Sequence, residues 1–337
     1  MKKNILLLLL LTLIFAGCSK PTTGEQSGSD EKTYVIKAGH AASKEHFAQK
    51  TFEKFKEIVE RNSKGKIKVE IYPEGELGGE REMVEQVLLG DLTMIAPASA
   101  PLDAATKSMA VWDLPYLFKD RETAHKVLDG EVGKEILDSL SDVGLKGLVY
   151  WENGFRHLTN SKKPVTSIND MKGLNMRTLE NSMQIKAWSA TGANTTPIAF
   201  TELYKALQSK TVDAQETPLS LMYASKFYEV QTYLTLTGHT YSPWPVVINK
   251  NFYDGLPENL QQVVMDAAVE TREYNRELSR ADEEKSLTLL KENGMEVIEL
   301  SVQQKQEFQE AMSGIYMDVK EDVGADIFDK LMSEVSK

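Results

Sequence analysis

Apolar and polar residues alternate along much of the chain with two spacings, one typical of strands and the other typical of helices. Residues 66–72 alternate strictly and end at Pro73, which predicts a half-buried strand. In residues 47–61 apolar side chains recur with helical spacing, which predicts an amphipathic helix. The same criteria predict further strands at 33–39, 93–96, 145–151 and 173–177, and further helices at 80–89, at 124–140, in a segment ending at Ala190 and at 201–208.

Strands that alternate with helices of this length predict an α/β fold with parallel, doubly wound sheets. One further helix is predicted at 257–293, because no proline or glycine lies between Leu260 and Glu292. With a rise of about 1.5 Å per residue, this helix is about 50 Å long, which is more than one domain requires. We therefore expect it to run across two domains as a brace.

The first residues have the composition of an export signal. Lys2 and Lys3 precede an apolar run of about twelve residues (5–16), too short to span a bilayer but typical of a signal peptide. The run ends in Phe-Ala-Gly before Cys18, the only cysteine, and this ending resembles the bacterial lipobox, in which the cysteine is lipidated. We expect a lipoprotein signal peptide at 1–17, lipidation of Cys18 and a flexible tether at 18–32. The alternative is an uncleaved anchor followed by a buried structural cysteine.

Length and charge limit the classes of function. The 337 residues exceed what one hydrophobic core usually organises, so two domains are expected. The formal net charge of −11 argues against a nucleic-acid partner, which would favour a basic excess. After residue 17 no stretch approaches the roughly eighteen apolar residues of a membrane span, so the chain is not expected to be a permease itself. An acidic protein that binds an anion must use a few placed cations.

Sequence motifs of common enzymes are absent. The chain contains no G-x-S-x-G, G-x-G-x-x-G, G-x-x-x-x-G-K-[ST] or H-E-x-x-H pattern. Its five histidines show no paired ligand spacing on one helix. We therefore expect neither enzymatic activity nor a cofactor or metal ion.

Two arginines are the strongest candidates for binding chemistry. Arg177 ends the predicted strand 173–177, and Arg156 lies in the segment after the strand 145–151. Ligands of open α/β sheets bind at the carboxyl ends of strands, so both side chains are expected in one crevice. A guanidinium donates two parallel hydrogen bonds to a carboxylate, which points to an organic acid. On spacing alone, two surface arginines are the simpler interpretation.

From about residue 32 to about residue 300, the chain resembles the extracytoplasmic solute receptors of tripartite ATP-independent periplasmic (TRAP) transporters, of the DctP type. The matching segments are collinear: 76–81 (ELGGER), 114–118 (LPYLF), 153–156 (NGFR), 171–177 (MKGLNMR), 206–208 (ALQ), 226–231 (KFYEVQ) and 238–239 (GH). The resemblance implies a fold like that of periplasmic binding proteins, with two α/β domains around a ligand cleft and a long helix spanning both. We expect domain I at 33–154 plus 243–282, and domain II at 155–242 plus 283–337.

The resemblance also implies the residues of the ligand site. Arg177 is expected to clamp the ligand carboxylate, with Arg156 as a second cation and Phe200 packed beside it. His40 and Glu80 match positions from which the other domain reaches polar ligand groups. Otherwise Glu80 is simply an acid in the first turn of a helix, and His40 merely finishes a strand. The remaining expected ligand-binding residues are Asn153, Glu216 and Thr217.

The expected ligand is a C4-dicarboxylate, on family frequency, or a sugar acid. Thr217 stands where relatives usually carry an asparagine, so one amide donor is lost or becomes a hydroxyl. The sialate-binding branch carries an acidic and a basic residue where this chain has Ala98 and Pro101, which argues against sialic acid.

The resemblance implies delivery of the ligand to an integral membrane permease with one small and one large subunit. The protein would then work outside the cytoplasm, either in a periplasm or lipid-anchored at the outer face of the cell membrane. Two alternatives stay open: a lipid-anchored enzyme acting on a carboxylated small molecule, and the substrate-binding lipoprotein of an ATP-driven importer.

Overall fold

The structure is a computed structural model that describes residues 32–337, so the expected signal peptide, Cys18 and most of the tether lie outside the described residues. The strands are β1 (Tyr34–Gly39), β2 (Ile67–Tyr72), β3 (Met94–Ile95), β4 (Leu145–Asn160), β5 (Asn175–Thr178), β6 (Asn194–Pro197), β7 (Ala214–Pro218), β8 (Tyr233–Asn249) and β9 (Glu296–Glu299). The α-helices are α1 (Phe47–Asn62), α2 (Glu80–Leu89), α3 (Ser99–Leu102), α4 (Arg121–Asp129), α5 (Glu131–Asp138), α6 (Ser182–Ala190), α7 (Phe200–Gln208), α8 (Leu219–Ala224), α9 (Lys250–Asp254), α10 (Glu258–Glu292), α11 (Val302–Met312), α12 (Ile315–Val323) and α13 (Ala325–Val335). The 3₁₀ helices are η1 (Lys107–Asp113), η2 (Ser139–Val143), η3 (Ile168–Met171) and η4 (Phe227–Glu229). Among residues 32–337, no helix has both the length and the apolar character of a membrane span.

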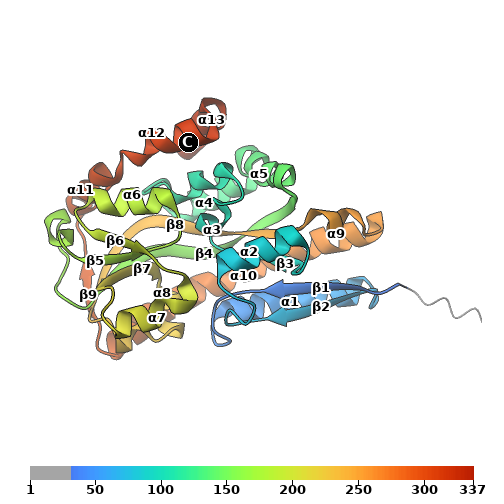
Figure 1. Ribbon diagram of the computed structural model, residues 1–337, viewed down its shortest axis with the longest axis horizontal. Helices are drawn as coiled ribbons and strands as arrows, with labels where there is room; N and C mark the ends of the chain where they lie inside the picture. The colour runs from blue at the N-terminus through green and yellow to red at the C-terminus, as the bar shows by residue number, and fades with distance from the viewer. Residues whose placement is uncertain (1–31) are drawn as a thin grey trace, which may run out of the picture. The chain divides into compact units, whose positions relative to one another are not determined.

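The strands of the described residues form one mixed sheet (Figure 1). Its order is β2-β1-β3-β8-β4-β7-β5-β6, and β9 pairs with the start of β8. The strands at each end are parallel to their neighbours, β1 with β2 and β3, and β5 with β6 and β7. In the centre, β8 runs antiparallel to β3 and β4, and β4 runs antiparallel to β7. The prediction of wholly parallel, doubly wound sheets is therefore wrong at the centre.

The two central strands explain this difference. The strand β4 continues to Asn160, whereas the sequence pattern predicted its end at residue 151. The second half of β4 buries polar side chains, so it shows no alternation of apolar and polar residues from which a strand could be predicted. The strand β8 contains Pro243 and Pro245, which lower the strand signal. On the side of β8 that faces β3, only Val247 and Ile248 are paired. The N–H groups that Pro243 and Pro245 lack are therefore not needed for hydrogen bonds to β3, and both prolines are tolerated.

The single helix predicted at 124–140 is two helices, α4 and α5. Gly130 separates them with an extended backbone conformation, φ −81° and ψ −175°. Gly133 then lies so close to α4 that an added Cβ would sit 2.1 Å from the carbonyl oxygen of Leu128. The glycines therefore turn the chain back, and the two short helices pack against each other.

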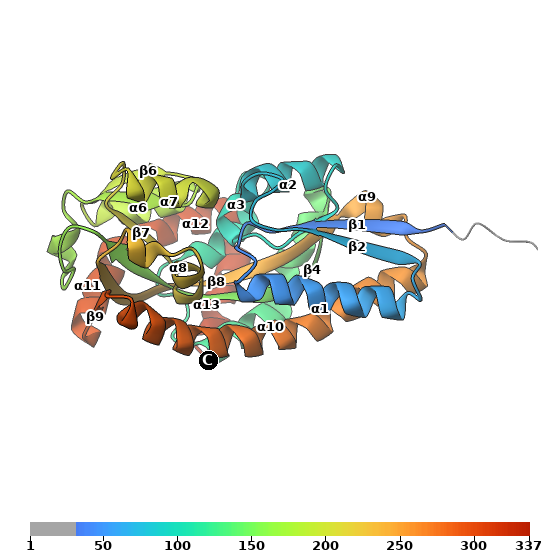
Figure 2. The same ribbon diagram turned by 90° about the horizontal axis from the view of Figure 1, so that it is seen from below.

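The helix α10, 35 residues long, confirms the predicted brace. Its first half buries Leu260 and Val264 in a core with α1, β1 and β2. Its last turns bury Leu290 in a second core with α7 and α8. Figure 2 shows the helix running from one group of elements to the other along one face of the sheet.

The C-terminal helices contact both ends of the body. The helix α11 packs on α6 and η3, which belong to the expected domain II. The helices α12 and α13 pack on η1, α4 and α5, which belong to the expected domain I, and α12 also contacts α6. The domain boundaries themselves stay a prediction.

Candidate functional site

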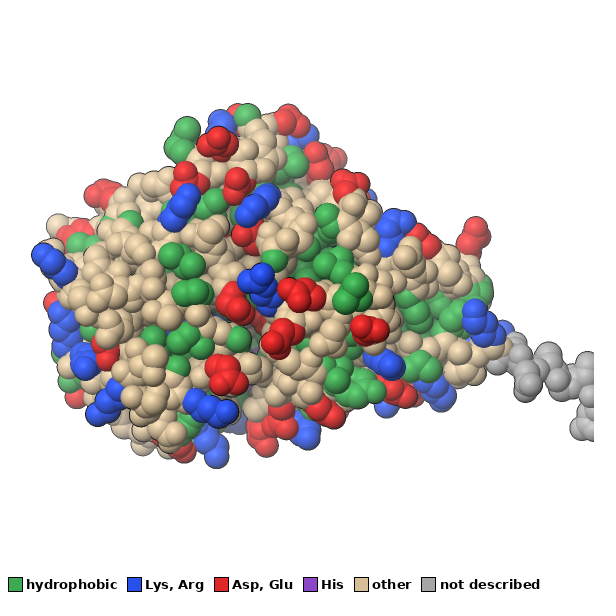
Figure 3. Space-filling view, in the orientation of Figure 1, with side chains coloured by type: hydrophobic (Ala, Val, Ile, Leu, Met, Phe, Trp, Pro, Cys, Tyr) green, Lys and Arg blue, Asp and Glu red, His purple; other side chains and the backbone are tan. Residues whose placement is uncertain are grey.

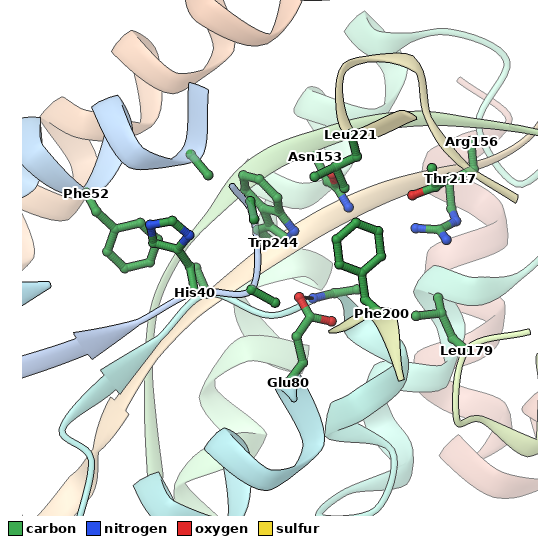
Figure 4. A pocket seen from close by; sticks show the side chains of 15 residues that line it. His40, Phe52, Glu80, Asn153, Arg156, Leu179, Phe200, Thr217, Leu221 and Trp244 are labelled. Carbon is green, nitrogen blue, oxygen red and sulfur yellow. Dashed lines mark hydrogen bonds between the residues drawn. The ribbon is translucent and has the colours of Figure 1, made fainter. Parts of the chain in front are cut away.

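One cavity collects most of the residues predicted for the ligand site (Figure 4). It contains about 470 Å³ of space not filled by protein atoms, its open mouth included. The predicted site residues that line it are His40, Glu80, Asn153, Arg156, Phe200 and Thr217. Arg177 and Glu216 are not among the lining residues, and both side chains are fully buried.

The lining residues lie where elements begin, end or change register. His40 directly follows β1, while Glu80 and Phe200 are the first residues of α2 and α7. Asn153 lies in β4 at a register shift between Glu152 and Gly154. Such irregular points aim side chains away from the regular ladder and toward a ligand.

The loop before α2 touches the start of α7 at the edge of this cavity. Gly75 has a left-handed backbone (φ +66°), and a Cβ on it would lie 2.5 Å from Cγ2 of Thr201. A Cβ on Gly79 would lie 3.5 Å from Cβ of Ala199. Glycine at position 75 therefore permits the close approach of these two segments.

Arg156 is held by an acid from the neighbouring strand. Its Nη2 donates to Oε1 and to the backbone oxygen of Glu216, each at 2.8 Å, and its Nε also donates to the carboxylate. His239 Nε2 lies 3.0 Å from Oε2 of the same carboxylate. Burial alone would raise the pKa of Glu216, but Arg156 and His239 lower it to about 2. The charge of Arg156 is therefore balanced within the protein, and Glu216 is turned toward Arg156 instead of the cavity.

Arg177 has no such partner. Its side chain is fully buried, and its Nε donates to the backbone oxygen of Ile198 at 2.8 Å. Both terminal nitrogens are buried without a hydrogen-bond partner. Burial lowers the pKa of Arg177 to about 10. Leu179, two residues further along the chain, lines the cavity, so Arg177 lies close to it in the chain.

The opposite side of the cavity offers polar atoms without a matching cation (Figure 4). His40 Nε2 lies 3.0 Å from Oε1 of Gln49, and its Nδ1 is buried without a partner. Burial lowers the pKa of His40, which keeps the ring neutral at pH 7. Asn153 donates from Nδ2 to Ser242 at 3.2 Å, while its Oδ1 has no partner.

Glu80 is the acid of this side. Its Oε1 accepts only a long hydrogen bond of 3.4 Å, from the N–H of Ala98. Burial raises the pKa of Glu80 to about 7, although the Ala98 N–H and the two arginines favour its charged form. Such a carboxyl group is weakly held and is available to accept a hydrogen bond from a ligand.

Aromatic rings complete the walls. Phe52 stacks on His40 with 5.0 Å between ring centroids, and Phe200 lies between Glu80 and Arg156 in the close view. Trp244 also lines the cavity. Trp244 was not predicted because the sequence pattern did not indicate β8, and Phe52 was covered only by the prediction of an amphipathic helix at 47–61.

The surface around these elements carries no uniform charge on the face seen in Figure 3, where acidic and basic side chains lie side by side. An anion would therefore be drawn by individual side chains and not by a basic field. Within residues 32–337, no group of three His, Cys, Asp or Glu side chains is placed to hold a metal ion.

Comparison with known proteins identifies the family. Residues 38–322 match the family model DctP, described as bacterial extracellular solute-binding protein, family 7. The 2,3-diketo-L-gulonate-binding periplasmic protein YiaO of Escherichia coli K12 is 41% identical over 254 residues, which are 75% of this chain and 76% of that protein.

Two solved structures are similar over nearly the whole described body. The sugar acid binding protein DctPAm of Advenella mimigardefordensis, in complex with galactonate, has a TM-score of 0.88 and 35% identity, covering 90% of this chain and 98% of that one. A TRAP periplasmic solute binding protein of Sulfurospirillum deleyianum with bound succinate has a TM-score of 0.84 and 33% identity, covering 89% of this chain and 98% of that one. The expected two-domain α/β ligand-binding fold is thereby confirmed. The chain belongs to the DctP family of bacterial extracellular solute-binding proteins, the receptors of TRAP transporters.

Proposed function

We propose that this receptor binds an organic acid in the cavity of Figure 4 with the ligand carboxylate on Arg177, and passes it unchanged to a TRAP permease. The observation that carries this proposal is the buried guanidinium of Arg177, whose two terminal nitrogens have no partner. A buried cation without a hydrogen-bonded counter-charge is costly, so the site is suited to an anion that arrives with the ligand. The family and its organic-acid relatives support the same ligand class.

Each predicted site residue then has a distinct task. Arg156, oriented by Glu216, would add a hydrogen bond and a positive potential next to the clamp. Phe200 would pack against the ligand and exclude water from the carboxylate. The ligand's polar groups would meet the side chains of His40, Glu80, Asn153 and Thr217.

Binding would close two domains, I (33–154 plus 243–282) and II (155–242 plus 283–337). The chain crosses between them in β4, β8 and α10, and Gly75 of one meets Thr201 of the other at the cavity edge. Closure removes water from the ligand and strengthens its charged hydrogen bonds. Small-angle scattering of the purified protein should give a smaller radius of gyration with ligand than without. An unchanged radius at saturation would contradict closure.

We further propose that Cys18 carries a lipid that holds the receptor at the outer face of the cell membrane. The short apolar run and the Phe-Ala-Gly-Cys ending support this proposal. Cys18→Ser should release the protein into the soluble fraction or leave an uncleaved precursor. Unchanged detergent partitioning of the variant at the mature mass would exclude the anchor.

The ligand class can be tested directly. Native mass spectrometry of freshly purified protein should detect any acid retained from the cell, and a thermal-shift screen should cover dicarboxylates, aldonates, uronates and keto acids. A ligand at 100 times its Kd stabilises the protein by about 2.7 kcal/mol. The receptor function is contradicted if no organic acid raises the unfolding temperature, or if the bound acid is recovered chemically changed.

A further inference from the structure

Of the two arginines of the proposed site, only one has terminal nitrogens that are free to pair with a ligand. Arg156 and Glu216 balance each other through two side-chain hydrogen bonds and a bond to the Glu216 backbone. Arg177 alone of this pair of arginines keeps unpaired terminal nitrogens. A ligand with a single carboxylate therefore neutralises the cationic side of the site.

The other side of the cavity carries an acid where a second ligand carboxylate would have to lie. Glu80 projects into the cavity from the start of α2, and Figure 4 shows it across Phe200 from Arg156. The charged groups that act on Glu80 are Arg156, Arg177 and Glu180. Both arginines belong to the clamp side, and so does Glu180, which follows Arg177 by three residues. A second carboxylate on this side would face like charge without a cation of its own.

The unpaired polar atoms on this side fit hydroxyl groups. Asn153 Oδ1 accepts hydrogen bonds only, and so does Glu80 when it is ionised, whereas the neutral ring of His40 can present either a donor or an acceptor at Nδ1. A hydroxyl group can donate a hydrogen bond to Asn153 Oδ1 and to the ionised Glu80. It can also pair with His40 Nδ1, whether that nitrogen is a donor or an acceptor. A carboxylate has no proton to donate, so it would leave these acceptors facing another acceptor.

We propose that Glu80 makes this receptor selective for a hydroxylated monocarboxylate, a sugar acid of the aldonate kind, and excludes C4-dicarboxylates. This inference rests on the proposed organic-acid receptor function and chooses between the two ligand classes that the sequence leaves open. Glu80 sets specificity in two ways: it accepts hydrogen bonds from ligand hydroxyls and it repels a second carboxylate.

The test compares binding by calorimetry for wild type, Glu80→Gln and Glu85→Gln. Glu85 is exposed on the same helix, so its variant makes the same charge change away from the cavity. The probes are galactonate and gluconate as aldonates, succinate as a dicarboxylate, and butyrate as a monocarboxylate without hydroxyl groups. Wild type and Glu85→Gln should bind an aldonate at least about 100-fold more tightly than succinate. Glu80→Gln should raise succinate affinity at least about tenfold, because the like-charge repulsion is gone.

A pH series gives a second readout. Lowering the pH from about 8 to about 6 protonates Glu80, so succinate binding to wild type should strengthen, while Glu80→Gln should show no such gain. If wild type binds succinate as tightly as the aldonates, or if Glu80→Gln leaves the ratio unchanged, the role of Glu80 is wrong while the receptor function stands. If no acid binds wild type, the receptor function itself is contradicted.

Discussion

The side chain of Asn275 in α10 forms two hydrogen bonds with the backbone of Glu152 in β4. Its Oδ1 accepts from the Glu152 N–H at 2.6 Å, and its Nδ2 donates to the Glu152 carbonyl at 3.3 Å. Both residues are fully buried, and the β4–β8 register shifts just after Glu152. The helix thus supplies the hydrogen bonds that the irregular strand requires, next to Asn153 in the cavity wall.

Replacing Asn275 with leucine should destabilise the protein. The buried N–H of Glu152 would lose its acceptor, and leaving such a donor unsatisfied costs about 1–3 kcal/mol. Urea unfolding of Asn275→Leu measures the change. Glu277→Ala, an exposed position on the same helix, is the control and should stay within about 0.5 kcal/mol of wild type. Equal stabilities for the two variants would show that this bridge contributes nothing.

Arg177→Met should abolish ligand binding without destabilising the ligand-free protein. Loss of one member of a buried charged pair costs about 2–5 kcal/mol of binding, or roughly 30- to 5,000-fold in affinity. Burial lowers the pKa of Arg177 to about 10, below its ordinary value, so the empty fold disfavours the charged form. The unfolding temperature without ligand should therefore stay equal or rise.

Arg177→Lys keeps the charge but loses the planar fork, so it should weaken binding at least about tenfold. The control for both variants is Arg81→Met, an exposed arginine that should leave binding and stability unchanged. Wild-type affinity in Arg177→Met would rule out the proposed clamp.

Gly75→Ala should weaken ligand binding, and Gly65→Ala should not. Both glycines have left-handed backbones, with φ of +66° and +79°, so each substitution costs about 1 kcal/mol of stability. Only the Cβ at position 75 meets Thr201, while the one at position 65 has no atom within 4 Å. Calorimetry on both variants separates contact at the cavity edge from backbone strain. Equal affinities would show that this contact has no part in closure.

Acid should destabilise the protein partly through His46. Its Nδ1 accepts from the Ala48 N–H and its Nε2 contacts Ser220, each at 3.1 Å, and burial lowers its pKa to about 3. The unfolded chain binds this proton near pH 6.5 and the folded chain does not, so stability falls as the pH drops from about 6.5 toward 3. One such group contributes at most about 1.4 kcal/mol per pH unit.

His46→Asn keeps an N-cap acceptor and removes the titrating group, so its stability should fall less steeply over this range. Urea unfolding at several pH values measures both slopes. The buried His157, with a pKa lowered by burial to about 3, should leave part of the slope in the variant. Parallel curves for variant and wild type would contradict the role of His46.

The local pattern of residues in the sequence was sufficient to predict many of the helices and strands of this protein. The absence of proline and glycine between Leu260 and Glu292 predicted α10 almost to the residue, and the family resemblance implied six of the residues that now line one cavity. Helix formation and strand ends depend on neighbours within a few positions, which a single sequence displays.

Tertiary structure alone decided which charges are free. Arg156 and Glu216 are sixty positions apart in the chain, yet the antiparallel pairing of β4 with β7 brings them together, and the terminal nitrogens of Arg177 are left without a hydrogen-bond partner. The prediction of β8, and with it of Trp244, would likewise have required knowing that β3 and β4 lie alongside this strand. Partner strands and the loss of water around a charge are properties of the packed chain, because they depend on residues distant in sequence.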